Sequence, residues 1–198
     1  LSTSLYNYAL QNDIVNKNYA EFIILGKPEK SKKEPFTELD IKKMFAFVNK
    51  VDWVDTILIL IYTGMRISEL LGLTRFNVDM DQQLITGGVK TDAGKDRIIP
   101  IHPKIAGLVQ KWYDKGGNYL ICNEKGGKIS VSSYRDDKYY PALKQLELKR
   151  LTPHSCRHTF GTLLSKAGAN TRAIQDMIGY SDYALTANIY THTDLDEL

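Results

Sequence analysis

Apolar residues recur at helical spacing along most of the chain. Thr37 is a residue type that often caps helix N-termini. After it, apolar side chains recur on one helical face, at Ile41, Met44, Phe45 and Val48. The next run, VDTILILIYTG, is apolar on all sides and predicts a central, buried helix that ends at Gly64. RISELLGL then predicts a further short helix.

Helical patterns also occur at the start of the chain and through its second half. The first residues indicate the end of a helix, with apolar side chains at Leu5, Tyr8, Ala9 and Ile14. Five more helices are expected at 103–114, about 130–147, 154–167, 171–178 and 182–190.

A short β section separates the two helical parts. Apolar runs alternate with turn residues and predict strands at 77–80, 84–90 and 97–101. The turn TDAGK, residues 91–95, makes the last two strands a hairpin. The expected fold is therefore mainly α with a small antiparallel β-sheet, an α+β architecture.

Composition narrows the class of protein only moderately. The chain has 198 residues with 43% hydrophobic and 25% charged residues, as in ordinary globular proteins, and its formal net charge of +3 permits a nucleic-acid partner without requiring one. Its two cysteines are too few for a disulfide scaffold, and the longest apolar run, ILILI, is too short to cross a bilayer. We therefore expect a soluble protein of a reducing, cytoplasmic setting.

The first candidate site is TGMRISELLGL, in which Arg66 precedes Glu69 by three residues. Residues at this spacing share a helix face, so Glu69 could hold Arg66 or its neighbourhood. An ordinary ion pair at a helix start explains the pattern. An arginine fixed on a rigid base to bind phosphate explains it as well.

The hairpin carries a second group of cations, Lys90, Lys95 and Arg97. Lysines at a hairpin tip are commonly solubilising, but they could also contact a bound anion. A lysine beside other cations can lose its proton, which makes Lys90 a candidate general acid.

The third site is HSCRHTF, which follows Pro153, a residue suited to the first turn of a helix. His154 and Arg157 then lie on one face of that turn, where anions are favoured. His158 lies on a neighbouring face. We expect no metal here because the tetrahedral ligand spacing of zinc sites is absent, and we interpret Cys156 as a small buried packing residue.

The fourth site, GYSDYALTANIYTH, places Tyr190 near the end of the last expected helix. Gly179 is expected to end the preceding helix. Since the chain has 12 tyrosines, packing is the commoner role for any one of them.

Together, the four motifs resemble the catalytic domain of the tyrosine recombinases, the phage integrase family, over residues 37–194. The resemblance covers TG-x-R-x-x-E, the hairpin lysine, H-x-x-R-H and the final Y-T-H. It implies that Tyr190 is the nucleophile and Lys90 the general acid, with Glu69 in support. It also implies that Lys95, Arg97 and His158 contact DNA and that the phosphate is bound by Arg66, His154, Arg157 and Tyr180.

One position departs from the family pattern. Tyr180 stands where the family usually has histidine or tryptophan. A tyrosine hydroxyl can also donate a hydrogen bond to a phosphate oxygen, with a different reach.

The resemblance also implies the domain plan and the partners. Residues 1–25 would be the C-terminal remnant of a core-binding domain, 26–36 a basic linker or plain surface loop, and 37–198 the catalytic domain. Double-stranded DNA would be the partner, bound in a synaptic complex of four copies in the bacterial cytoplasm near the nucleoid, with no cofactor, metal or membrane. The isolated chain could be a monomer, and accessory DNA-bending or directionality proteins could take part.

The implied activity is site-specific recombination through a 3′-phosphotyrosine link, which integrates or excises a mobile element. Two alternatives stay open: relaxation of supercoils by a type IB topoisomerase-like enzyme, and a DNA-binding relative without turnover.

Overall fold

The computed structural model describes residues 2–18, 34–87 and 97–170, together with Arg172, Ile174 and Ile178. The chain divides into two compact units, residues 1–32 and 33–198, and the division falls inside the segment expected to be a linker. The first unit holds helix α1, Ser2–Gln11. Its assignment to a core-binding domain stays a prediction.

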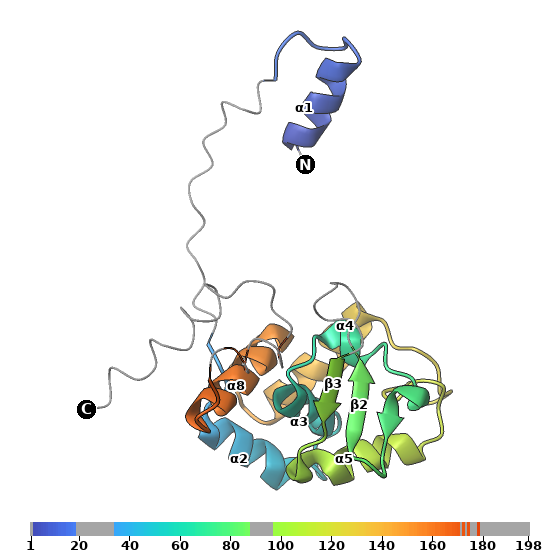
Figure 1. Cartoon of the computed structure of the whole chain (residues 1–198), viewed down its shortest axis with the longest axis vertical. Helices are drawn as coiled ribbons and strands as arrows, with labels where there is room; N and C mark the ends of the chain where they lie inside the picture. The colour runs from blue at the N-terminus through green and yellow to red at the C-terminus, as the bar shows by residue number, and fades with distance from the viewer. Residues whose placement is uncertain are drawn as a thin grey trace, which may run out of the picture. The chain divides into compact units, whose positions relative to one another are not determined.

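The second unit is mostly helical with a small sheet, which confirms the expected fold class (Figure 1). Its described helices and helical turns are α2 (Glu38–Phe47), α3 (Val54–Thr63), α4 (Ile67–Leu70), η2 (Arg75–Asn77), α5 (Pro103–Asp114), α6 (Val131–Tyr134), η4 (Arg135–Tyr139), α7 (Tyr140–Gln145) and α8 (Pro153–Lys166). None of the helices in the described residues is long and apolar enough to cross a membrane. The expected helices at 171–178 and 182–190 fall outside the described residues, apart from the three named above.

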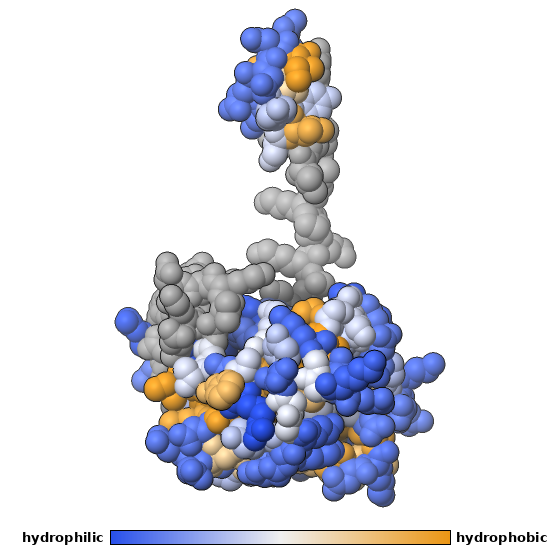
Figure 2. Space-filling model, turned by 90° about the vertical axis from the view of Figure 1, so that its right-hand side faces the viewer, coloured by the Kyte–Doolittle hydropathy of each residue, from blue (hydrophilic) through white to orange (hydrophobic). Residues whose placement is uncertain are grey.

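Helix α3 forms the centre of the core, as its apolar sequence predicts. All of its residues except Tyr62 are buried, and it packs against α2, α5 and α8 (Figure 1). Thr37 caps helix α2 as expected, because its side-chain oxygen accepts a hydrogen bond from the Asp40 backbone N–H at 3.2 Å. On the face shown in Figure 2, apolar side chains form small separate patches among polar ones, because the large apolar groups are mostly enclosed.

The three strands form one antiparallel sheet in the order β1-β2-β3. They are β1 (Val78–Asp79), β2 (Leu84–Gly87) and β3 (Arg97–Pro100). Gly87 pairs with Arg97 at one end of the hairpin stem. The predicted hairpin is thus confirmed for its stem, whereas its tip, with Lys90 and Lys95, lies outside the described residues.

The helix expected at about 130–147 contains a wide π-turn, η4, between α6 and α7. Pro141 has no N–H to donate, so the regular hydrogen-bond ladder is interrupted at this point. The turn places both Tyr134 and Tyr139 in the core, where the Tyr139 hydroxyl lies 3.6 Å from the sulfur of Cys156. Cys156 is fully buried, and this burial raises the pKa of its thiol to about 12, which confirms its interpretation as a packing residue.

Gly64 allows α3 to end directly against α8. Its φ of +63° lies in the left-handed region, and a Cβ on this residue would lie 2.3 Å from the Phe160 ring. We expect Gly64→Ala to lower the free energy of unfolding by about 2 kcal/mol or more, because backbone strain and overpacking add. Urea denaturation would measure the loss.

Gly107 is the matched control, since it lies within α5 and a Cβ there would meet nothing within 4 Å. Gly107→Ala should be stabilising by about 0.5–1 kcal/mol. Equal effects of the two substitutions would contradict the role given to Gly64.

Candidate active site

Arg66 is held at the junction between α3 and α4 by a carboxylate of its own sequence motif. The Arg66 backbone N–H donates to Oε2 of Glu69 at 2.8 Å, and its side-chain Nη1 donates to Oε1 at 2.7 Å. The Arg66 side chain remains 31% exposed, whereas that of Glu69 is 2% exposed. Glu69 therefore fixes the direction of an arginine that is still accessible to a ligand.

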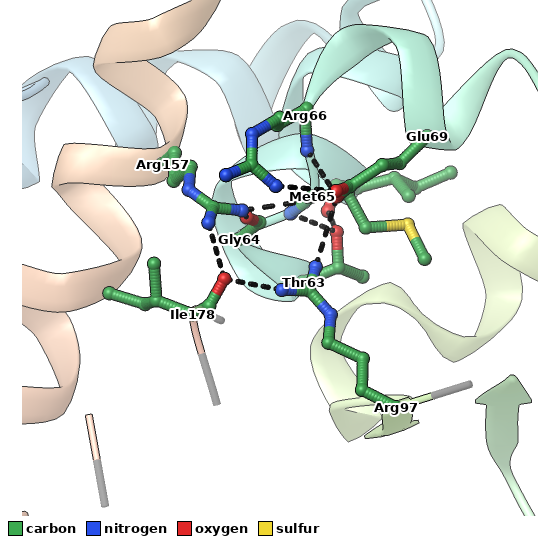
Figure 3. Close-up of polar contacts among 9 residues, drawn as sticks. Thr63, Gly64, Met65, Arg66, Glu69, Arg97, Arg157 and Ile178 are labelled. Atoms are coloured by element: carbon green, nitrogen blue, oxygen red, sulfur yellow. Dashed lines mark hydrogen bonds and ion pairs between the residues drawn. The ribbon is translucent and has the colours of Figure 1, made fainter. Parts of the chain in front are cut away.

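Glu69 also binds cationic side chains from two distant segments (Figure 3). Nη2 of Arg97, at the start of β3, donates to Oε2 of Glu69 at 3.1 Å. Nη1 of Arg157, on α8, lies 3.8 Å from the same oxygen. We call these four residues, Arg66, Glu69, Arg97 and Arg157, the arginine–glutamate cluster. It brings together three of the four sequence motifs.

Arg157 is the most enclosed member of the cluster, with a side chain that is 1% exposed. Its Nη1 donates to the Gly64 carbonyl at 2.8 Å, and its Nη2 donates to the carbonyl of Ile178. The Ile178 carbonyl also accepts a hydrogen bond from Nη1 of Arg97. Ile178 itself packs with Phe160 of α8 in a small apolar cluster, which helps to fix this carbonyl.

His154 lies in the first turn of α8, three residues before Arg157, so both side chains project from one side of that helix. Helix α8 begins at Pro153, as expected. The His154 side chain is exposed and its ring meets that of His158 edge to face, with 4.7 Å between centroids. His158 is buried, so the exposed ring of His154 packs against an enclosed one.

Burial also bears on the residues expected to contact DNA. Arg97 and His158 are both enclosed, with 8% of the Arg97 side chain exposed. Burial lowers the pKa of Arg97 and the Glu69 carboxylate opposes this effect. Direct contact of either side chain with DNA stays a prediction that this burial disfavours.

Four expected site residues fall outside the described residues: Lys90, Lys95, Tyr180 and Tyr190. Within the described ranges, no group of three or more histidine, cysteine, aspartate or glutamate side chains could hold a metal ion. Sequence reasoning missed the backbone acceptors, the Gly64 and Ile178 carbonyls, because a carbonyl carries no residue-type signal.

Neutralising Glu69 should destabilise the fold strongly. In Glu69→Gln, three guanidinium groups lose their shared anion at a buried position. We expect a loss of about 3 kcal/mol or more in the free energy of unfolding, as for other broken buried ion pairs. The measurement is urea denaturation of the whole chain.

The control is Glu38→Gln, which removes an exposed carboxylate 3.0 Å from Lys166. Its unfolding midpoint should stay close to that of the wild type, because solvent screens exposed pairs. If Glu69→Gln shifted the unfolding midpoint as little as Glu38→Gln does, this result would contradict the importance given to the buried carboxylate.

The sequence of the chain is similar to those of known proteins. A family model described as the phage integrase family matches residues 34–197. The chain is 30% identical to the tyrosine recombinase XerC of Pelobacter propionicus, an alignment that covers 98% of this chain and 67% of that protein. It is also 30% identical to the transposase from transposon Tn916 of Enterococcus faecalis, over 99% of this chain and 57% of the transposase.

Solved structures agree with the sequence comparison. The integrase of transposon Tn1549, solved in complex with a circular intermediate DNA, superposes with a TM-score of 0.76 at 26% identity, covering 98% of this chain and 73% of that one. A lambda integrase dimer bound to a core site shares the fold, with a TM-score of 0.78 at 15% identity. The chain spans 42–67% of the length of the curated XerC relatives that it matches. The family match over residues 34–197, which contains the arginine–glutamate cluster, shows that the chain belongs to the phage integrase family.

Proposed function

We propose that the chain is the catalytic part of a site-specific DNA recombinase that cuts and rejoins strands through a 3′-phosphotyrosine link. The observation that carries this proposal is the arginine–glutamate cluster, in which a buried carboxylate aligns Arg66, just before α4, with Arg157 of α8. Planar guanidinium groups bind two phosphate oxygens at once, so this arrangement suits a scissile phosphate. Two alternatives, relaxation of supercoils alone and DNA binding without turnover, gain no support from the relatives.

In the proposed reaction, the Tyr190 oxygen attacks the scissile phosphorus and the bond from phosphorus to the 5′-oxygen breaks. The phenolic proton passes to a base, for which His154 is the candidate, and Lys90 gives a proton to the departing 5′-oxygen. A 5′-hydroxyl from another strand reverses the step and releases the tyrosine. Because the phosphodiester energy is kept in the tyrosine link, no nucleotide is needed.

Arg66 and Arg157 would stabilise the negative charge that builds on the non-bridging oxygens in the transition state. The two residues differ in access, because Arg66 is partly exposed and Arg157 is enclosed. The Gly64 and Ile178 carbonyls hold the guanidinium group of Arg157 in place. Tyr180 would add a hydrogen bond to the phosphate.

Double-stranded DNA is the proposed partner. The Tn1549 integrase was solved with a circular intermediate DNA, and the lambda integrase with a core site. Lysine and arginine contacts to phosphates should make the affinity fall steeply with salt concentration. Assembly of four copies on two sites, in the cytoplasm, belongs to the same proposal.

Product topology tests this function. A supercoiled plasmid with two copies of the DNA from the ends of the encoding genetic element is incubated with the protein, without added metal. Recombination gives deleted or inverted plasmids, depending on the orientation of the two sites. Relaxed plasmid with no exchanged product would indicate a topoisomerase-like enzyme, and unchanged plasmid would indicate a binding protein.

A further inference from the structure

Arg97 lies at the first position of β3, where the hairpin stem meets the arginine–glutamate cluster. It is a cation of the hairpin, as a DNA-contacting residue would be, but its side chain points into the protein and is 8% exposed (Figure 3). Its two terminal nitrogens have separate acceptors. Nη2 donates to Oε2 of Glu69 at 3.1 Å, and Nη1 donates to the Ile178 carbonyl.

These two acceptors are the same groups that hold Arg157. The Ile178 carbonyl accepts from Nη2 of Arg157, and Oε2 of Glu69 lies 3.8 Å from its Nη1. The same Glu69 oxygen also accepts the Arg66 backbone N–H. Arg97 therefore forms a planar bridge between a helix-borne carboxylate and a backbone carbonyl, and both of these contact the arginines expected to bind phosphate.

We propose that Arg97 is a positioning residue that acts through Glu69 and the Ile178 carbonyl to fix Arg66 and Arg157, and that it makes no contact with DNA. This inference rests on the proposed function, since the phosphate is what the two arginines would bind. It also links strand β3, which begins directly after the hairpin tip, to the segment that contains Ile178.

The shape of the side chain matters as much as its charge. A guanidinium fork can reach two acceptors in fixed directions, whereas a lysine ammonium is a single point of charge. Arg97→Lys should keep a bond to one acceptor and lose the other. We expect Arg97→Gln to slow cleavage of bound DNA by up to about 100-fold, as small displacements of catalytic groups do, and Arg97→Lys to recover part of this loss.

The test is a double-mutant cycle with Glu69. Cleavage of pre-bound DNA and DNA affinity over a range of salt concentrations are measured for Arg97→Gln, Glu69→Gln and the double variant. We expect Arg97→Gln to cost far less in the Glu69→Gln background than alone, because both changes disturb one network. We also expect no change in the slope of log affinity against log salt.

The proposal is overturned if the two effects multiply independently and the salt slope falls by about 0.9, the value for one lost phosphate contact in B-DNA. Arg75→Gln is the matched control, since this arginine is half-buried with its guanidinium carbon 4.5 Å from the Tyr113 ring centre and is outside the cluster. Its effect should be unchanged in the Glu69→Gln background. If Arg97→Gln does not fold, Arg97→Lys replaces it in the cycle.

Failure of the proposed function can be distinguished from failure of the role given to Arg97. If the wild-type chain cleaves no DNA, that function is wrong, and the same cycle is read from unfolding midpoints. A double variant less destabilised than the sum of its single variants would support the bridge between Arg97 and Glu69. Additive losses would overturn it.

Discussion

Arg157→Lys is expected to slow DNA cleavage by about 10²–10³-fold, the usual cost of removing one donor from a charge-stabilising site. The enclosed guanidinium donates to the Gly64 carbonyl at 2.8 Å and to the Ile178 carbonyl while it lies beside Glu69. A lysine ammonium cannot satisfy these three groups together. We therefore also expect a loss of about 1–3 kcal/mol in the free energy of unfolding, because a buried carbonyl loses its donor.

Arg66→Lys is the matched comparison. It should slow cleavage by a similar factor, since Arg66 is expected to bind the same phosphate. Its stability cost should be smaller, below about 1 kcal/mol, because its side chain is 31% exposed and water can replace the lost contact. Single-turnover cleavage and urea denaturation of both variants measure the two effects. Wild-type cleavage by Arg157→Lys would contradict the proposed role of Arg157.

Local sequence patterns predicted several helices and strands of this fold. The all-apolar run of α3, the cap at Thr37 and the start of α8 at Pro153 each depend on a few neighbouring residues, and each is found where the sequence indicates. The stem of the hairpin was likewise predictable, because its turn residues and alternating strands are local signals. Pro141 was the one local signal for the interrupted helix, and its consequence at η4 was not predicted.

The contacts within the candidate site were less accessible to sequence reasoning. The spacing of Arg66 and Glu69 predicted their ion pair, but the same carboxylate also binds Arg97 and lies beside Arg157. These contacts join residues that are far apart in the chain, so they leave no periodic pattern in the sequence. The burial of Arg97 was hidden for the same reason. Its sequence context, a lysine-rich hairpin, indicated a surface cation.

Covalent trapping of DNA on Tyr190 tests the central claim most directly, because only a nucleophile forms a bond to the substrate. The protein is incubated with a nicked substrate that carries the proposed recombination site, and the 5′-hydroxyl fragment of this substrate diffuses away after cleavage. No metal is added, and the products are separated on a denaturing gel beside those of Tyr190→Phe.

A phenylalanine keeps the ring but has no hydroxyl to attack phosphorus, so the expected loss is complete. We predict a slow-migrating, protease-sensitive DNA band with the wild-type chain and none with Tyr190→Phe. Salt-sensitive DNA binding without any such band in the wild type, or a band that persists in Tyr190→Phe, would contradict cleavage through this tyrosine.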